Sequence, residues 1–310
     1  MSNRAVVVDP EAPGRLVLRP VPDPVADRGE AVVRVRALSL NRGEVRRAGM
    51  AAAGWRPGWD LAGTVELAAA DGSGPRAGAR VVGLLLEGAW AERVAVPTHA
   101  LAALPDKVTF AQAATFPVAG LTALYALAKR GSLLARRVLV TGATGGVGDF
   151  ATQFARLGGA HVTATVRRAE QGALVRQAGA HEIVVGEEVP ATPKYDLVID
   201  SVGGRTLGTA LAALERGAVC VTLGVSASAE VTFDTRTFFV TGRTTLYGFY
   251  LFAELGIEPA GDGLRRIADL VATGQVAPRI SLERPWTDVG QVAQDLMARR
   301  FPGKAVLAID

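Results

Sequence analysis

A glycine-rich segment at residues 138–148 is the part of the chain whose composition most directly indicates a binding chemistry. It reads Val-Leu-Val-Thr-Gly-Ala-Thr-Gly-Gly-Val-Gly and joins an apolar run to a helix-prone one. Glycine lets a backbone turn tightly and approach a ligand without a Cβ in the way. The helix that follows offers unpaired N–H groups and a positive dipole end, both of which bind phosphate. We therefore expect the pyrophosphate of a dinucleotide at this turn.

The dinucleotide-binding pattern G-x-G-x-x-G/A fits this turn in two registers. It occurs literally at residues 146–151, and a related register at residues 143–148 starts nearer the strand end and is preferred for that reason. A strand before the turn, a helix after it and a second strand at residues 162–166 provide the context that the pattern requires. The residues expected to hold the phosphates are Gly142, Ala143, Gly145, Gly146 and Val147.

Two arginines, Arg167 and Arg168, follow the second strand of this unit. A dehydrogenase that uses NADH usually has Asp or Glu here, which accepts hydrogen bonds from the ribose 2′-hydroxyl. Arginine suits a 2′-phosphate instead, through charge-assisted hydrogen bonds of roughly 1.5–3 kcal/mol each. The alternative is a pair of solvated arginines in an arginine-rich chain. We expect NADPH as the cofactor in preference to NADH.

The elements that must position this turn alternate between strands and helices. Strands are expected at residues 138–141, 162–166, 182–185, 196–200, 218–223 and 244–250, and helices at 146–157, 170–178 and 205–214. Continuous apolar strands that alternate with helices predict a doubly wound parallel sheet with both faces covered. Bound dinucleotides lie beyond the carboxyl ends of such strands. Further cofactor contacts are therefore expected at Ser201, Val202, Gly203, Leu223 and Gly224.

The remainder of the chain predicts a second domain with a different architecture. Residues 1–100 contain short apolar runs between Pro- and Gly-rich turns, which are typical of a β-barrel or sandwich. Helices at 264–273 and 289–299 and a terminal strand at 305–309 are expected to return to this domain. The predicted fold is α/β, with a β-rich domain at residues 1–114, a nucleotide-binding domain at 115–252 and a return segment at 253–310.

Composition excludes several classes of protein. The 310 residues suit two domains at roughly 100–200 residues each. The net charge is only +4 and no block of basic residues occurs, so we expect no nucleic-acid partner. No apolar run approaches the ~18–20 residues of a membrane helix, and the N-terminus lacks a signal sequence. The single cysteine, Cys220, excludes disulfides within the chain. We expect a cytoplasmic protein.

Five further segments, in order along the chain, resemble the medium-chain dehydrogenase/reductase superfamily in its zinc-independent, quinone oxidoreductase-like branch. They surround the glycine turn and together cover essentially the whole chain. The resemblance implies a GroES-like catalytic domain, a Rossmann domain and a homodimer. The segments are 39–44 (N-x-x-D/E), 57–65 (P-G-x-D/E-x-x-G-x-V), 88–92 (G-x-x-A-E), 117–123 and 303–307 (G-K-x-V-L).

The resemblance also bears on metal binding. Zinc-dependent relatives have cysteine, histidine and a cysteine or acid at the positions that match Asn41, Trp59 and Val118 of this chain. Asparagine, tryptophan and valine cannot assemble a tetrahedral zinc site. The relatives' structural-zinc lobe needs four cysteines, and this chain has only Cys220. We therefore expect no zinc and no other metal.

The activity implied by the resemblance is hydride transfer from NADPH to a small-molecule quinone or enone (an α,β-unsaturated carbonyl). Conjugation spreads the developing negative charge of such an acceptor, so a Lewis acid is less needed. Asn41 is the first candidate near the nicotinamide, where its amide could donate to a carbonyl oxygen or hold the ribose; a turn-forming asparagine is the alternative. Glu44 and Asp60 match family acids and are further catalytic candidates, or they brace loops through salt bridges.

The resemblance adds four residues to the cofactor contacts. Thr122 matches a family threonine beside the nicotinamide. Tyr247, Gly248 and Phe249 lie where the last strand of the nucleotide domain meets the nicotinamide, although a core aromatic cluster is an equal interpretation. Two other functions stay open. One is an enoyl-thioester or polyketide-tailoring reductase on the same scaffold, and the other is a non-catalytic NADPH-binding structural or RNA-binding protein.

Overall fold

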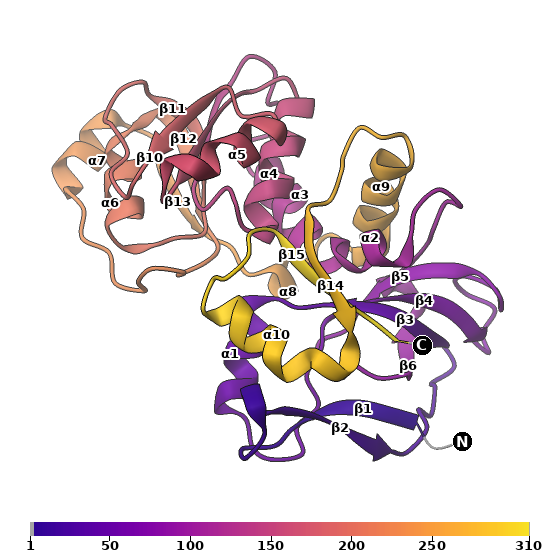
Figure 1. Cartoon of the computed structure of the whole chain (residues 1–310). Coiled ribbons are helices and arrows are strands. Elements are labelled where there is room, and N and C mark those ends of the chain that lie inside the picture. Colours follow the sequence, from indigo (N-terminus) through magenta and orange to yellow (C-terminus); the bar gives the residue numbers. More distant parts are fainter. Residues whose placement is uncertain (1–2, 310) are drawn as a thin grey trace. The chain divides into compact units, whose positions relative to one another are not determined.

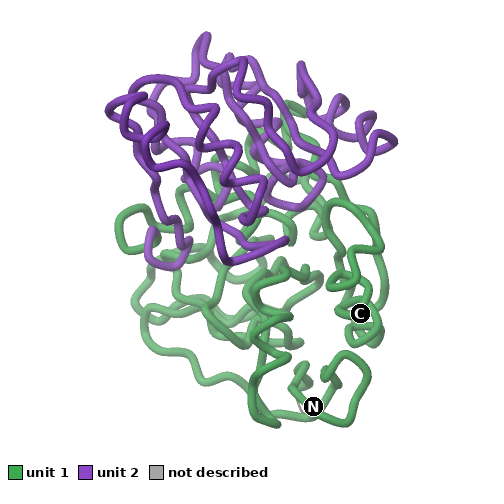
Figure 2. The backbone as a smooth tube through the Cα atoms, turned by 90° about the vertical axis from the view of Figure 1, so that its left-hand side faces the viewer, with its two compact units in different colours: residues 1–121, 255–310 green, residues 122–254 purple. Residues whose placement is uncertain are grey.

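The chain folds into two compact units, which are coloured separately in Figure 2. The computed structural model describes residues 3–309. Unit 1 consists of residues 1–121 and 255–310, and unit 2 of residues 122–254. The sequence-based boundaries lie after residues 114 and 252. Residues 1, 2 and 310, at the outer ends of the predicted segments, lie outside the described residues.

Unit 2 contains a six-stranded parallel sheet in the order β10-β9-β8-β11-β12-β13, and Figure 1 labels β10, β11, β12 and β13 of this sheet. In chain order this is 3-2-1-4-5-6, so the strand order reverses between β8 and β11. The central strands are largely apolar, and residues 138–140 and 197–199 within them are buried, as a sheet covered on both faces requires. This confirms the doubly wound parallel sheet predicted from the sequence. The strands are β8 (Arg137–Val140), β9 (His161–Val166), β10 (Glu182–Val185), β11 (Tyr195–Asp200), β12 (Leu214–Thr222) and β13 (Thr245–Gly248).

The predicted helices at 146–157, 170–178 and 205–214 correspond to α4, to η4 with α5, and to α6, whereas α7 and α8 were not predicted. The predicted helix at 146–157 is confirmed, and it buries Phe150, Ala151 and Phe154. Helix α7 was not predicted because its Thr, Phe and Val residues favour strands; the Asp234 carboxylate starts it by accepting two backbone N–H groups. The helices are α3 (Leu121–Ala128), α4 (Gly146–Leu157), η4 (Ala169–Gln171), α5 (Gly172–Gln177), α6 (Gly204–Ala212), α7 (Thr235–Thr241) and α8 (Leu251–Glu254).

Unit 1 is built on a seven-stranded sheet in the order β14-β15-β3-β4-β5-β7, with β6 also paired to β3. The C-terminal strand β15 pairs with β3 through the register Val306↔Ser39, so the end of the chain lies in the same sheet as residues 30–39. The strands are β1 (Asn3–Val8), β2 (Leu16–Val21), β3 (Glu30–Ser39), β4 (Asp60–Leu67), β5 (Arg80–Leu84), β6 (Arg93–Pro97), β7 (Leu101–Ala103), β14 (Ile280–Pro285) and β15 (Lys304–Ala308).

Short helices complete unit 1. Helix α1 was not predicted from the sequence; its N-cap is Asn41, whose backbone N–H donates to the side chain of Glu44, the third helical residue, at 2.6 Å. No helix between residues 3 and 309 is long and apolar enough to cross a membrane. The helices are η1 (Pro13–Arg15), α1 (Arg42–Met50), η2 (Thr98–Ala100), α2 (Phe110–Ala114), the π-helical turn η3 (Phe116–Gly120), α9 (Ala260–Ala272), η5 (Trp286–Asp288) and α10 (Val289–Met297).

Candidate functional site

The glycine turn between β8 and α4 is closed so tightly that a side chain at either of two positions would lie too close to its neighbours. Gly142 has φ +61°, and a Cβ there would lie 2.5 Å from the Ser201 hydroxyl. A Cβ on Gly148 would lie 2.4 Å from the carbonyl oxygen of Gly142 and 2.6 Å from Cα of Ala143. The start of α4 therefore rests against the turn, and its first N–H groups have no intrahelical acceptor. This geometry fits a pyrophosphate.

A buried carboxylate holds the turn against the neighbouring strand. Asp200, at the end of β11, is fully buried and accepts from the Thr141 hydroxyl at 2.6 Å and the Gly203 N–H at 3.0 Å. The Ser201 hydroxyl donates to the Thr141 carbonyl oxygen at 3.0 Å. Burial raises the pKa of Asp200, although these donors lower it in part. Sequence reasoning missed Thr141 and Asp200; an acid that ends an apolar strand was the available signal.

The structure brings most of the expected cofactor residues to one edge of the unit 2 sheet. This edge comprises the carboxyl ends of β9, β8, β11, β12 and β13, which are neighbours in the sheet. Thr122 is different, because it lies buried in helix α3 and not at a strand end. The residues that follow these strands are Arg167 and Arg168 (β9), Gly142, Ala143, Gly145, Gly146 and Val147 (β8), Ser201, Val202 and Gly203 (β11), Leu223 and Gly224 (β12), and Phe249 (β13), while Tyr247 and Gly248 close β13 itself.

The arginine pair lies at the surface of unit 2. Both side chains are exposed, and Arg168 forms an ion pair with Glu170 at 2.6 Å. The partners are 64% and 67% exposed. Exposed pairs of this kind contribute about 0–1 kcal/mol, so a phosphate can displace Glu170 at little cost.

The aromatic residues near β13 have separate environments. Phe249 is buried, and its N–H donates to the Thr222 carbonyl oxygen. The Tyr247 hydroxyl donates to Glu254 at 2.6 Å, and Lys129 donates to the other carboxylate oxygen of Glu254 at 2.5 Å. Burial raises the pKa of Glu254, but the hydrogen bonds from Lys129 and Tyr247 outweigh it and the pKa is lowered overall. The hydroxyl of Tyr247 is therefore already engaged within unit 2.

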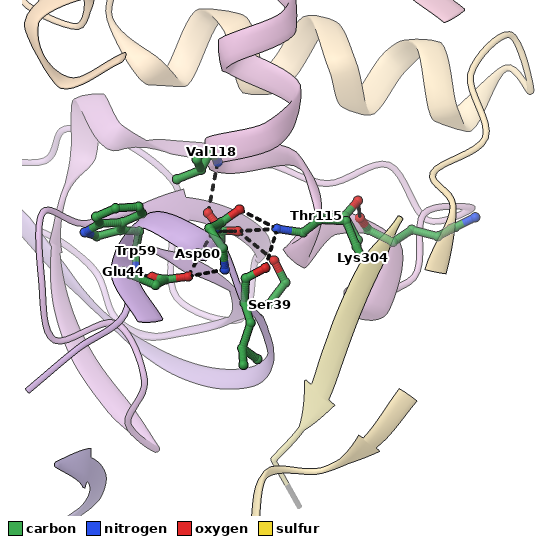
Figure 3. A network of polar contacts seen from close by, with 10 residues as sticks. Ser39, Glu44, Trp59, Asp60, Thr115, Val118 and Lys304 are labelled. Atoms are coloured by element: carbon green, nitrogen blue, oxygen red, sulfur yellow. Dashed lines mark hydrogen bonds and ion pairs between the residues drawn. The ribbon is translucent and has the colours of Figure 1, made fainter. Parts of the chain in front are cut away.

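A second group of functional candidates forms a buried cluster in unit 1 (Figure 3). We call Ser39, Asn41, Glu44, Asp60 and Lys304 the polar cluster. They come from the end of β3, the start of α1, the start of β4 and the start of β15. Ser39, Glu44, Asp60 and Lys304 are buried, and Asn41 is partly exposed. The three catalytic candidates named from the sequence are thus in direct contact.

Asp60 is the centre of the polar cluster. Its Oδ2 accepts from the Ser39 hydroxyl at 2.6 Å and from Nδ2 of Asn41 at 2.7 Å. The ammonium group of Lys304 lies 3.2 Å from the same oxygen. Oδ1 accepts the backbone N–H of Val118 at 2.9 Å. Lys304 was not named from the sequence, although the G-K-x-V-L segment contained it.

Glu44 is the second buried carboxyl group of the polar cluster. Its Oε1 accepts the N–H of Asn41 at 2.6 Å, and its Oε2 accepts the N–H of Trp59 at 2.8 Å. Burial, followed by the negative charge of Asp60, raises the pKa of Glu44 well above its usual range. Lys304 and the donors from Asn41 oppose this rise.

The three positions that match the ligands of zinc-dependent relatives all contact the polar cluster. They are Asn41, Trp59 and Val118. Asn41 and the backbone N–H groups of Trp59 and Val118 all donate to the two carboxyl groups. Within residues 3–309 no three His, Cys, Asp or Glu side chains are grouped so that they could hold a metal ion. At these three positions the groups that face the two carboxyl groups are N–H groups, which do not ligate a cation.

Two family models match the chain. One, described as "Alcohol dehydrogenase GroES-like domain", matches residues 27–106. The other, described as "Zinc-binding dehydrogenase", matches residues 146–262. The first match covers strands β3 to β7 of unit 1, and the second begins at Gly146, at the start of helix α4.

Individual proteins align over most of the chain. A quinone oxidoreductase of Pongo abelii is 30% identical over 224 residues, which are 67% of this chain and 68% of that protein. The mitochondrial NAD(P)H oxidoreductase RTN4IP1 of Mus musculus is 31% identical over 72% of this chain, and the match spans only 62% of its length. A mycobacterial protein solved in complex with NADPH is 27% identical, with a TM-score of 0.85, 99% of this chain covered and 100% of that chain.

Proposed function

Because the chain belongs to the medium-chain dehydrogenase/reductase superfamily, in its quinone oxidoreductase-like branch, we propose that it is an NADPH-dependent reductase of quinones or α,β-unsaturated carbonyls. The observation that carries the proposal is the glycine turn at the point where the strand order reverses between β8 and β11. Ligands of doubly wound sheets bind at this point. The NADPH complex of the mycobacterial relative supports the same cofactor.

Residues of unit 2 would hold the cofactor. The first N–H groups of α4 and the turn at Gly142 suit the pyrophosphate, and Arg167 and Arg168 suit the 2′-phosphate. The bound nicotinamide would supply the hydride. The protein's own contribution is position and polarity, because an oriented acceptor reacts without the entropic cost of an encounter in solution.

The group that we propose to orient the reacting molecules lies in the polar cluster. Asn41 is the partly exposed member of the polar cluster and is the proposed contact. Glu44 and Asp60 are 0% exposed, so we propose that they act through Asn41 and do not touch a ligand themselves.

Cofactor binding tests the proposal directly. NADPH should quench the intrinsic tryptophan fluorescence and raise the Tm. At an NADPH concentration of a hundred times Kd, binding should raise the free energy of unfolding by about 2.7 kcal/mol. Turnover with quinones, 2-enals and enoyl thioesters would then separate the proposed activity from the enoyl-thioester or polyketide-tailoring alternative. If NADPH neither quenches fluorescence nor raises the Tm, the structural or RNA-binding alternative is favoured.

We propose that the reaction needs no metal. The support is the polar cluster, in which N–H donors and Lys304 surround the carboxyl groups. Metal analysis of the purified protein should find no stoichiometric zinc, and activity should survive chelators. One zinc per chain would overturn this part of the proposal, which the family description "Zinc-binding dehydrogenase" makes a necessary test.

We also propose that the chain forms a homodimer through β13. This strand ends the sheet of unit 2, and Leu246 on it and Tyr250 beyond it are 42% and 64% exposed. An unpaired edge with exposed apolar residues is a template for a second strand. Light scattering should give the dimer mass for the wild type and the monomer mass for Leu246→Lys. The cytoplasmic location stays a prediction, which cell fractionation would test.

A further inference from the structure

Lys304 is a buried cation whose hydrogens all have acceptors. Its Nζ lies 2.6 Å from Oδ1 of Asn41 and 3.2 Å from Oδ2 of Asp60. The third acceptor is the carbonyl oxygen of Leu40 at 3.1 Å. The side chain is 4% exposed. Because an ammonium group donates three hydrogen bonds, this one is saturated, which makes its burial tolerable.

The start of β15 places this lysine. Gly303 has φ +64°, and a Cβ there would lie 2.5 Å from the carbonyl oxygen of Arg279. The N–H of Lys304 donates to the same carbonyl oxygen at 2.9 Å. β15 then pairs with β3 from Val306 onward. The lysine side chain therefore reaches the end of β3, where Asn41 begins the following helix.

The charges around Asn41 determine which way its amide faces. Nδ2 donates to Glu44 at 3.0 Å and to Asp60 at 2.7 Å, while Oδ1 accepts from Lys304. The reverse orientation would place the amide oxygen against two carboxyl groups and the NH₂ against an ammonium. Both amide hydrogens are thus used, and the oxygen retains one lone pair. Asn41 is partly exposed, so a ligand can meet that lone pair.

We propose that Lys304 is a positioning residue that holds Asn41 with its amide oxygen as the open hydrogen-bonding group, so that Asn41 receives a hydroxyl and not a carbonyl oxygen. This rests on the proposed function and deepens it, because it selects between the two roles considered for Asn41. The hydroxyl belongs either to the nicotinamide ribose of the cofactor or to the acceptor molecule. Both sources share the same chemistry.

A double-mutant cycle on the full chain tests the proposal. The variants are Lys304→Met, Asn41→Ala and the double variant, with the exposed Lys107→Met as the matched control for loss of a lysine. Each single variant should raise the Kd of NADPH, or the KM of the acceptor, about tenfold to a hundredfold, as expected for the loss of a hydrogen bond in a charged network. The double variant should bind the ligand as tightly as Asn41→Ala does, because Lys304 acts only through Asn41. Losses that multiply would overturn the proposal.

Two binding measurements identify the source of the hydroxyl. If it is the ribose, Lys304→Met raises the Kd of NADPH and leaves that of adenosine 2′,5′-bisphosphate unchanged, since this fragment lacks the nicotinamide half. If it is the acceptor, the Kd of NADPH is unchanged and the KM of a hydroxyl-bearing quinone rises, while that of 1,4-benzoquinone does not. Wild-type protein that binds no NADPH would contradict the proposed function, whatever the variants show.

A spectroscopic signature tests the positioning role without any ligand. The side-chain NH₂ of Asn41 should give a ¹H–¹⁵N signal, identified by its absence in Asn41→Ala, that is shifted and protected from exchange. The signal should lose its protection in Lys304→Met and keep it in Lys304→Gln, whose amide can still donate to Asn41. If Lys304→Met does not fold, Lys304→Gln carries the cycle with a smaller effect. An unprotected signal in the wild type would refute the proposal.

Discussion

Replacing Gly148 by alanine should show how closely the glycine turn is packed. The added Cβ would lie 2.4 Å from the carbonyl oxygen of Gly142, about 1 Å closer than ordinary contact, and 2.6 Å from Cα of Ala143. Both of these are backbone atoms, which cannot move aside as a flexible side chain can. Overpacking of this kind costs about 1–3 kcal/mol. Alanine recovers about 0.5–1 kcal/mol of helix propensity. The net expectation is a loss of about 1–2 kcal/mol and a Tm lower by about 3–8 °C.

The same shift should weaken the cofactor. Moving the start of α4 misplaces N–H groups whose charge-assisted bonds to phosphate contribute about 1.5–3 kcal/mol each, so the Kd of NADPH should rise at least tenfold. Thermal unfolding and fluorescence titration of Gly148→Ala measure both effects. The matched control is Gly49→Ala in helix α1, where an added Cβ meets nothing within 4 Å, and this variant should be slightly stabilised. A Gly148→Ala protein with wild-type Tm and Kd would refute the reasoning.

Three further predictions concern charge and burial. Replacing Arg167 and Arg168 together by alanine should raise the Kd of NADPH about tenfold to a hundredfold and leave that of NADH unchanged. Arg216→Ala is the control. An equal rise in the Kd of both cofactors would exclude a 2′-phosphate contact. Burial raises the pKa of the Cys220 thiol well above its usual range, so a thiol reagent should label the unfolded chain and not the folded one at pH 8; rapid labelling of folded protein would contradict this. Burial, followed by the charge of His161, whose ring stacks on that of His181, lowers the pKa of His181 from its usual value of about 6.5. The stability that His181 contributes is therefore present above about pH 6.5 and lost as the pH falls. The Tm of the wild type should therefore drop more between pH 7 and 5 than that of His181→Gln, and parallel pH curves would show that His181 does not titrate as expected.

Local patterns in the sequence carried most of what could be predicted about the fold. Apolar strands alternating with helices predicted the parallel sheet, and the glycine turn predicted where it would bind a dinucleotide. Both depend on residues close together in the chain, since strand burial and turn geometry are properties of short segments. Helix α7 was missed for the same reason, because its local composition favours a strand while the Asp234 cap starts a helix.

The partners of buried polar groups depend on which distant strands pair. Asn41 and Lys304 are 263 residues apart, and nothing in either segment indicates that they meet. The pairing of β15 with β3 brings them together. Likewise, Asp200 meets Thr141 only because β8 and β11 are neighbours in the sheet.

The sequence by itself therefore determined the fold class, the glycine turn and the identity of the three catalytic candidates. Only the tertiary structure decided what these candidates can do. It enclosed Glu44 and Asp60 and engaged both amide hydrogens of Asn41. It also placed the buried charge of Lys304 against the amide oxygen of Asn41. The physical reason is that buried donors and acceptors pair with whichever groups the fold brings next to them. The sequence of one segment does not indicate which groups those are.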